Sequence, residues 1–280
     1  MKRIHSSILA GSVTFISILI AGCSMHDQFE SKQRTEFNRQ PLTDTVILTE
    51  SDIAGLPSPV QKYLRFTGSV GKARPQNVRV EFDAQMFRKP GSAPMNASSE
   101  QINFFRIPAR IFYMEASQYL VPFRVLHAYQ NSEATMVVRV ASLFNAVDLS
   151  GKDLTEAETV TILNDICFFA PGALVDDRIT WKEIDPLTVD ARFTNGAYSI
   201  SARLIFDQDG SLVNFVSNDR GALQDDGSLR KVPWSTPIGK YRDFEGRRVP
   251  TYGEAIYHYP EGPFTYGIFM LKTIEYNAPL

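Results

Sequence analysis

An alternation of apolar and polar residues with a period of two runs through most of this chain and predicts β-strands. In residues 77–86 the apolar Val78, Val80, Phe82 and Ala84 alternate with polar residues, as in a strand with one buried face. Similar segments predict further strands at residues 101–107, 110–116, 119–129, 134–141, 179–184, 188–193, 198–207, 212–219, 239–244, 252–259 and 264–276.

Two glycine-containing turns between these segments indicate hairpins. Asn195-Gly196 is typical of a type I′ turn, and Asp209-Gly210 of a slightly longer loop. Short connections of this kind join antiparallel neighbours, because a parallel pair needs a long crossover. We therefore expect a long antiparallel meander in two runs, interrupted once by a helix.

Two segments have helical signals instead. Residues 56–68 carry Ser58 as a candidate N-cap and an apolar stripe with helical spacing. Residues 156–167 follow a capping box formed by Thr155 and Glu158. The apolar stripe of the second helix needs a buried partner, and the concave face of the sheet can supply it. The expected fold is mainly β (α+β): a long antiparallel curved sheet or half-barrel with one or two helices packed on its concave face.

The N-terminus has the order of an export signal: a basic start, an apolar segment at residues 8–20, and small residues before Cys23. The apolar segment is too short for a bilayer, which takes about 20 apolar residues. Residues 19–23, Leu-Ile-Ala-Gly-Cys, resemble the lipobox of bacterial lipoproteins, which implies cleavage before Cys23 and acylation of its thiol. The alternative is an uncleaved anchor helix that ends in a cysteine by chance.

This resemblance divides the chain into three parts. Residues 1–22 would be the lipoprotein signal peptide, residues 23–45 the lipidated cysteine and a flexible tether, and residues 46–280 a single β-rich domain. Residues 24–45 are polar and aperiodic, and the alternative is that part of them forms a short helix packed on the domain. The partner implied by the lipid is a membrane of the cell envelope. Ser24 implies the outer membrane, facing the periplasm, if the host is Gram-negative.

Charge and cysteine content narrow the possible functions. The chain has 29 basic and 31 acidic residues, a formal net charge of −2, so it has no global basic field to attract nucleic acid. Cys167 is the one cysteine besides Cys23, and acylation of Cys23 would therefore exclude an intramolecular disulfide. The fold must then be held together by its apolar core.

Metal and cofactor signals are weak. Histidines follow Cys23 only at His26, His127 and His258, with no helical pair of histidines and no closely spaced pair of cysteines. There is no Gly-x-Ser-x-Gly motif, and Cys167 lies on the apolar side of a predicted helix. We expect no metal and no cofactor.

The best candidates for acid–base catalysis are Glu254 with His258 or His127. Glu254 and His258 share a face of one predicted strand, but four residues at about 3.3 Å each separate them by about 13 Å, too far for direct contact. His127 follows apolar residues on one face of its strand. Either histidine could serve as a general base if the two strands meet inside a cleft. The alternative is a structural role for all three.

Several aromatic residues lie in strands that have no polar face. Residues 111–114, Ile-Phe-Tyr-Met, are apolar on both alternating faces, so this strand is buried on both sides or lines an apolar cavity. A solid core closed by the helices would explain the same pattern. The candidates for the concave or core face, and for ligand contact, are Phe82, Phe104, Phe112, Phe123 and Phe206.

Three motifs together resemble an uncharacterised bacterial lipoprotein family. They are Leu-Pro-Ser-Pro-Val-Gln-Lys-Tyr-Leu-Arg at residues 56–65, Val-Pro-Trp-Ser-Thr-Pro at residues 232–237, and a Gly-Glu strand within residues 245–267. The resemblance covers most of residues 56–276 and implies no activity. The expected architecture alone is similar to the half-barrel proteins that carry or receive lipids and lipoproteins in the bacterial envelope, and analogy of fold is a weak ground for function.

Three functions remain open from the sequence. The first is a membrane-anchored lipoprotein that binds an apolar or amphipathic ligand, a lipid or a lipoprotein, in a β half-barrel. The second is a non-enzymatic envelope scaffold that binds a protein partner through an exposed sheet edge. The third is a hydrolase-type enzyme that uses Glu254 and a histidine.

Overall fold

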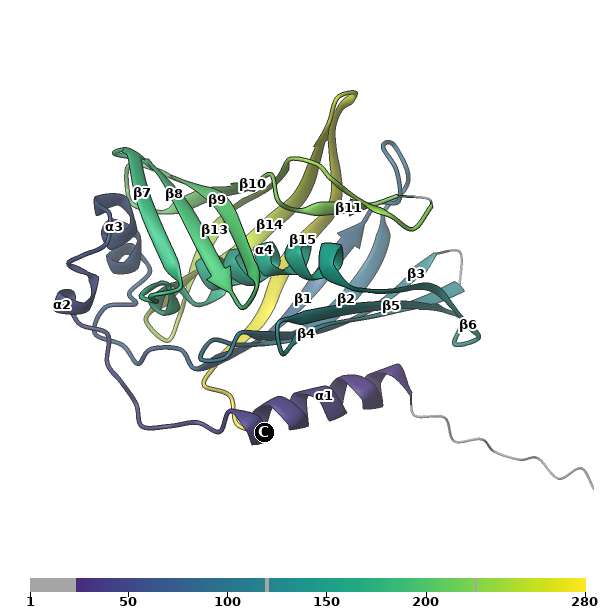
Figure 1. The fold of residues 1–280 in the computed structure, drawn as a ribbon, viewed down its shortest axis with the longest axis horizontal. Coiled ribbons are helices and arrows are strands. Elements are labelled where there is room, and N and C mark those ends of the chain that lie inside the picture. The colour runs from purple at the N-terminus through teal and green to yellow at the C-terminus, as the bar shows by residue number, and fades with distance from the viewer. Residues whose placement is uncertain (1–23, 119–120, 225) are drawn as a thin grey trace, which may run out of the picture.

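The computed structural model describes residues 24–118, 121–224 and 226–280. The predicted signal peptide at residues 1–22 and the predicted lipidation site Cys23 lie outside the described residues. A single antiparallel sheet curves around one long helix, α4 (Lys152–Phe169), and two smaller helical regions cover its outside and one of its ends (Figure 1). The expected mainly β fold, with a helix on the concave face of an open curved sheet, is confirmed.

Thirteen strands form this sheet within the described residues, in the order β6-β5-β4-β3-β2-β1-β15-β14-β13-β10-β9-β8-β7. The first and last strands, β1 and β15, pair at its centre and join the two runs of the meander. The strands are β1 (Asn77–Met86), β2 (Met95–Phe104), β3 (Ala109–Gln118), β4 (Val121–Gln130), β5 (Glu133–Val140), β6 (Phe144–Ser150), β7 (Ile179–Asp185), β8 (Thr188–Asn195), β9 (Tyr198–Phe206), β10 (Leu212–Ser217), β13 (Trp234–Phe244), β14 (Arg247–Tyr259) and β15 (Gly262–Tyr276).

Three of the observed strands were not predicted. β6 is an edge strand whose residues are mostly exposed, so it has no buried face to impose an alternating pattern. β11 (Gly221–Leu223) and β12 (Leu229–Lys231) form a separate short ribbon, too short for a periodic signal. Periodicity therefore found the strands that bury a face and missed those that do not.

Helix α4 lies inside the curve of the sheet and is buried on almost all sides. The predicted capping box at its start is wrong. The helix begins about one turn earlier than that box requires, after Gly151, whose φ of 102° suits glycine. The Thr155 hydroxyl donates to the Gly151 carbonyl oxygen at 2.8 Å and accepts from the Ala134 N–H at 3.0 Å. Glu158 is thereby free to face the interior.

Helix α3 (Ser58–Phe66), with the short α2 (Glu50–Ile53), closes one end of the core. Pro57 rather than Ser58 occupies the N-cap position, because Ser58 is already helical. The Tyr63 hydroxyl donates to the Cys167 carbonyl oxygen at 2.6 Å. Burial raises the pKa of the Cys167 thiol far above its ordinary value, so this cysteine acts as a small apolar side chain.

The predicted flexible tether is instead helical over most of its length. Helix α1 (Met25–Arg39) packs on the outer face of β2, β3 and β4, and it buries Met25, Phe29 and Phe37. Its N-cap is a reciprocal capping box between Ser24 and Asp27. The alternative of a helix packed on the domain was the correct one. The helix was missed because so few of its residues are apolar. None of the described helices is long and apolar enough to cross a membrane.

Candidate functional site

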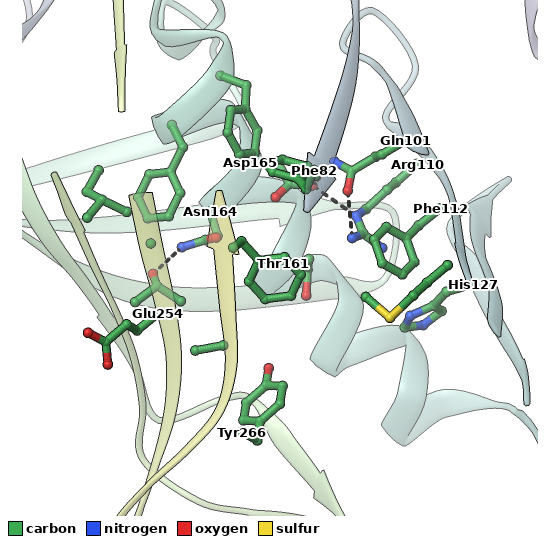
Figure 2. A pocket seen from close by; sticks show the side chains of 18 of the residues that line it. Phe82, Gln101, Arg110, Phe112, His127, Thr161, Asn164, Asp165, Glu254 and Tyr266 are labelled. Atoms are coloured by element: carbon green, nitrogen blue, oxygen red, sulfur yellow. Dashed lines mark hydrogen bonds and ion pairs between the residues drawn. The ribbon is translucent and has the colours of Figure 1, made fainter. Parts of the chain in front are cut away.

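A cavity of about 340 Å³ lies between α4 and the concave face of the sheet (Figure 2). Strands from both runs of the meander line it, together with one face of α4. Its apolar wall consists of Phe82, Met86, Phe112, Met114, Val125, Met136, Val138, Phe168, Phe169, Trp234, Ile238, Phe269 and Leu271. A volume in this range and a mainly apolar wall are typical of small-molecule binding sites.

Strand alternation explains why these side chains point inward. On β3, Phe112 and Met114 line the cavity, while Ile111 and Tyr113 point the other way and pack under α1. On β4, Val125 is the direct partner of Met114 and lines the same wall. The strand that lacks a polar face is thus buried on one side and lines an apolar cavity on the other.

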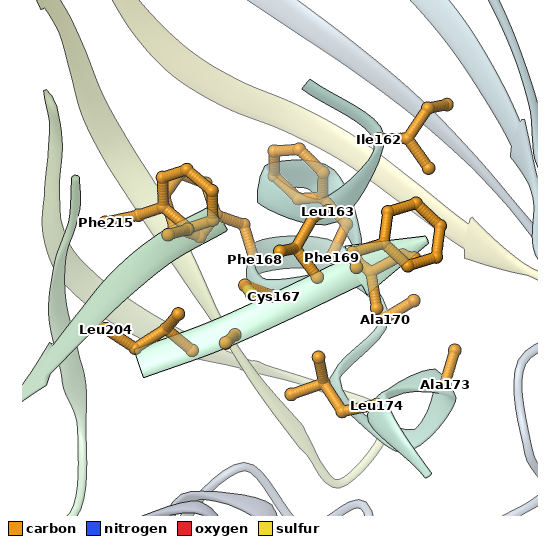
Figure 3. Close-up of a cluster of buried hydrophobic side chains, with 14 of the residues drawn as sticks. Ile162, Leu163, Cys167, Phe168, Phe169, Ala170, Ala173, Leu174, Leu204 and Phe215 are labelled. Atoms are coloured by element: carbon orange, nitrogen blue, oxygen red, sulfur yellow. The ribbon is translucent and has the colours of Figure 1, made fainter. Parts of the chain in front are cut away.

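The remaining part of the α4 surface packs into a solid core rather than a cavity (Figure 3). Leu163 and Cys167 are fully buried there, and the ring of Phe168 lies 6.4 Å from that of Phe215, edge to face. Leu204 belongs to the same cluster. Phe168 belongs to this core cluster and also lines the cavity, so the two regions meet at its ring.

Six residues of α4 line the cavity, and helical spacing puts four of them on one face of the helix. Glu158, Thr161, Asp165 and Phe168 recur at intervals of three and four residues, which puts them on one face of the helix, and all four line the cavity. Three of the four are polar. Helix α4 thus contributes a mainly polar part of the cavity wall.

Glu158 is the centre of a buried group of charges. Its Oε1 lies 2.6 Å from Nη1 of Arg220, and its Oε2 lies 3.7 Å from Nη1 of Arg110 and 3.4 Å from Nε2 of His127. Arg110 comes from β3, His127 from β4, and Arg220 from the segment between β10 and β11. We call Glu158, Asp165, Arg110, Arg220 and His127 the charge cluster.

Asp165 forms the second carboxylate of this cluster. Its Oδ2 accepts hydrogen bonds from Nε of Arg110 at 2.9 Å, Nε2 of Gln101 at 2.7 Å and Nδ2 of Asn103 at 3.0 Å. Arg110 also donates through Nη2 to Oε1 of Gln101 at 2.8 Å, and Figure 2 shows these groups meeting at one end of the cavity. Three donors on one oxygen are the pattern expected of an ionised carboxylate.

Burial and charge shift the pKa values of the cluster in different directions. Burial alone would raise the pKa of Glu158, but Arg220, His127 and Arg110 outweigh it and lower that pKa to about 2. Burial lowers the pKa of His127 to about 4, against the opposing attraction of Glu158. Burial raises the pKa of Asp165. At neutral pH Glu158 is therefore a carboxylate and His127 a neutral imidazole.

Two nitrogens of the cluster have no hydrogen-bond partner among the described residues. They are Nε2 of His127, which approaches Glu158 without the alignment of a hydrogen bond, and Nε of Arg220. The guanidinium of Arg220 also lies over the ring of Trp234, 5.4 Å from its centroid. Unpaired buried polar atoms are rare and costly in native proteins, at about 1–3 kcal/mol each. Both side chains line the cavity.

Of the five phenylalanines predicted from the sequence, Phe82 and Phe112 line the cavity (Figure 2). The ring of Phe82 packs 5.5 Å from that of Phe169 on α4. The guanidinium carbon of Arg110 lies 4.7 Å from the centroid of the Phe112 ring. Phe112 thus connects the apolar wall to the charge cluster.

The other three phenylalanines lie elsewhere. Phe104 is on the outer face of the sheet, where its ring contacts that of Phe37 of α1 at 5.1 Å. Phe206 is in the solid core beside Tyr63. Phe123 is only half-buried and lines a separate surface depression. Alternation in the sequence identified buried faces, but it could not tell a core face from a cavity wall.

The structure does not bring the predicted acid–base residues together. Glu254 and His127 lie on different sides of the cavity in Figure 2. The Glu254 carboxylate accepts hydrogen bonds from the hydroxyls of Tyr252 at 2.7 Å and Thr265 at 3.3 Å. His258 is exposed and its Nε2 is hydrogen-bonded to the Ser235 hydroxyl at 2.7 Å. Among the described residues no hydrogen bond or ion pair links Glu254 to either histidine, and a catalytic role for these three residues stays a prediction.

Sequence reasoning missed four of the five members of the charge cluster: Arg110, Glu158, Asp165 and Arg220. The one available signal was the helical spacing of the polar residues Glu158, Thr161 and Asp165. The described part of the chain contains no group of three or more His, Cys, Asp or Glu side chains arranged to hold a metal ion.

The fold and the cavity define the class of protein: an open antiparallel half-barrel with an internal helix and a mainly apolar cavity. Residues 46–269 match DUF6544, described as a family of unknown function, and the chain belongs to this family. Membership of an uncharacterised family, expected from the motifs, is confirmed. A search of curated protein sequences finds no significant match.

Two solved structures are similar in outline. A domain named for outer-membrane lipoprotein sorting from Vibrio parahaemolyticus matches at 6% identity and a TM-score of 0.41, covering 73% of this chain and 86% of its own. A LolA superfamily protein from Nitrosomonas europaea matches at 8% identity and a TM-score of 0.41, covering 78% and 92%. TM-scores of 0.41 carry no conclusion about function, which is therefore inferred from the cavity.

Proposed function

We propose that this protein binds an apolar or amphipathic ligand, a lipid or an acylated protein, inside the half-barrel. The observation that carries the proposal is the cavity of about 340 Å³, with its apolar wall and a charge cluster at one end. Apolar side chains hold an acyl chain or a similar body without directional bonds, and a few convergent polar groups fix its orientation. No cofactor takes part.

The test is the identity of what copurifies with the protein. A form that begins at Ser24, exported by a different signal and purified without detergent, retains every described helix and strand. We expect mass spectrometry of its organic extract to find a lipid or acylated molecule in stoichiometric amount. Val138→Trp fills the cavity from β5 and should remove the ligand, whereas Thr135→Trp, exposed on the same strand, should keep it. A stable, ligand-free wild-type protein would contradict the proposal.

The same proposal includes an anchor at Cys23. Residues 19–23 support it through their resemblance to a lipobox, and α1 begins immediately after, at Met25. The lipid would hold the protein on a membrane of the cell envelope, the outer membrane if the host is Gram-negative. Incorporation of labelled palmitate by the wild type and its loss in Cys23→Ser is the expected result. Equal labelling of both forms would exclude Cys23 as the acylation site.

A second candidate function is binding of a protein partner at the β6 edge of the sheet. Two observations favour it: β6 has an unpaired edge, and apolar side chains are exposed beside it, Leu143 at 81% and Phe144 at 59%. A photo-crosslinking amino acid in place of Asn145, also exposed on β6, should capture one specific partner in cells. The same substitution at exposed Glu183 of the opposite edge strand, β7, is the control.

A further inference from the structure

The charges of the charge cluster balance one another without a ligand, and Glu254, a further carboxylate that lines the cavity, lies on a different side of it (Figure 2). Arg220 pairs with Glu158, and Arg110 pairs with Asp165 at 2.9 Å. His127 is neutral because burial lowers its pKa to about 4. With Asp165 ionised, as the three hydrogen-bond donors on its Oδ2 favour, the charge cluster has two guanidinium groups, two carboxylates and no formal net charge.

This balance restricts the charge of a ligand head group. An anionic head group next to the cluster would add a third negative charge to two cations that are already paired, in a site largely shielded from water. A cationic head group would likewise add a third positive charge to two carboxylates that are already paired. Burial of an uncompensated charge costs several kcal/mol. An uncharged polar head group does not incur that cost.

The unpaired nitrogens define what an uncharged head group must offer. Nε of Arg220 can only donate, so it requires an oxygen acceptor. Nε2 of the neutral His127 ring donates in one tautomer and accepts in the other. A hydroxyl satisfies either tautomer, because it both donates and accepts. His127 is only 8% exposed, so water at the surface cannot easily satisfy it.

The surroundings of these two nitrogens are apolar. His127 lies on β4 directly opposite Phe112 and Met136, which line the cavity. The Arg220 guanidinium lies over Trp234, another residue of the wall. A ligand that reaches the nitrogens thus has its apolar part in contact with aromatic and methionine side chains.

From this geometry we propose that the ligand is an acyl chain with an uncharged head group of ester and hydroxyl oxygens, as in an acylglycerol, which hydrogen-bonds to Nε of Arg220 and Nε2 of His127. The inference rests on the proposed function, since it names the class of ligand for the same cavity. It goes further in assigning the head group to the charge cluster and in excluding anionic amphiphiles as preferred ligands.

Trp234 provides a direct signal, because it lines the cavity and the other tryptophan, Trp181, is on β7 and outside it. The full chain carrying Trp181→Phe, reconstituted in nanodiscs, is titrated at neutral pH with 1-decanoylglycerol, decyl sulfate or decane while Trp234 emission is recorded. These three probes share a ten-carbon chain and differ in the head group. We expect decanoylglycerol to bind at least tenfold more tightly than decyl sulfate.

Two variants test the hydrogen bonds. His127→Phe removes Nε2, and Arg220→Lys keeps the positive charge beside Glu158 but removes the guanidinium Nε. Each should raise the Kd for decanoylglycerol about fivefold to tenfold, the effect of one lost hydrogen bond, and leave the Kd for decane unchanged. Comparing each variant with wild type for the same probe cancels the partitioning of that probe into the nanodisc. Circular dichroism and the melting temperature confirm that each variant is folded, and Arg220→Lys still tests the proposal if His127→Phe does not fold.

The outcomes separate the inference from the function beneath it. If decyl sulfate binds as tightly as decanoylglycerol, or if the folded variants weaken decane and decanoylglycerol equally, the assignment of an uncharged head group is wrong while lipid binding stands. If none of the three probes changes Trp234 emission, the proposed function fails, and the inference fails with it.

Discussion

Both faces of strands β2, β3 and β4 bury apolar side chains, yet they are covered in opposite ways. On the outer face, Phe29 and Phe37 of α1 pack against Tyr113 and Phe104 and leave a solid cluster. On the inner face, Phe112 and its neighbours line a cavity. The same strands thus form a packed cluster with α1 on one side and the wall of a cavity on the other.

This difference between the two faces shows that the inner face is not optimised for the stability of the fold. Apolar residues of similar volume in place of the charge cluster would remove the desolvation cost of buried ions, and such replacements are often neutral or stabilising. The cluster on the outer face consists of apolar residues, whereas the inner face keeps its buried ion pairs. A buried, balanced network with unpaired nitrogens beside empty space is better explained by a ligand than by stability of the fold.

The largest loss of stability is expected from removing the carboxylate of Glu158, the centre of the charge cluster on the inner face. Glu158→Ala leaves Arg220 and Arg110 buried near His127 without their shared partner, and we expect a loss of about 3–5 kcal/mol in the free energy of unfolding. Urea denaturation measures it. Glu156→Ala, which removes only a surface ion pair with Lys231, should change stability by less than about 1 kcal/mol. A similar small effect for both variants would mean that the cluster is not buried.

Truncation of one phenylalanine on each face compares the two directly. Phe104→Ala opens a hole in the solid cluster under α1 and should cost about 4 kcal/mol, as large-to-small changes in well-packed cores do. Phe112→Ala only enlarges an existing cavity, so its side chain loses fewer contacts and the cost should be about 2 kcal/mol. Urea denaturation of both variants gives the difference. Equal costs would show that the inner face is as tightly packed as the outer one.

The pH dependence of stability sharpens the comparison further, because only the inner face contains a buried histidine. The pKa of His127 is lowered to about 4, so between its unfolded value of about 6.5 and pH 4 the unfolded chain binds a proton that the folded protein does not. Stability should therefore fall as the pH falls, by about 2 kcal/mol between pH 7 and pH 5. The lowered pKa of Glu158 contributes only below about pH 4.5.

The control for that prediction is His127→Gln, which removes the titrating group. Urea denaturation at pH 7 and pH 5 should show the pH-dependent loss in the wild type and a smaller one in the variant. An identical pH dependence in both would assign the acid sensitivity to other groups.

The smallest expected effect concerns the start of α1 on the outer face. The Ser24 hydroxyl accepts from the Asp27 N–H at 3.0 Å, and the Ser24 N–H donates to the Asp27 carboxylate at 2.7 Å. Ser24→Ala removes one half of this capping box and should destabilise α1 by about 1 kcal/mol. Faster hydrogen exchange in α1, with unchanged exchange in α4, would confirm it. Slower exchange in α1 would show that the cap is not used.

Much of the fold was predictable because strand alternation is a local property. Residues 77–86 display one buried face in the sequence and form β1 with that face buried. The apolar run at residues 111–114 correctly indicated burial on both sides of β3. Helix α1 was missed because its three buried apolar residues are separated by polar ones, and its stability comes from the surface it covers.

The sequence by itself determined the mainly β class, the antiparallel meander and the buried helix, since each depends on the periodicity or turn chemistry of neighbouring residues. Only the tertiary structure decided which apolar face became a core and which a cavity wall. It alone also brought Arg110, Glu158 and Arg220 together, because they are far apart in the chain and meet only when the sheet curves around α4. Local patterns record whether a side chain is buried. What it is buried against depends on the path of the whole chain.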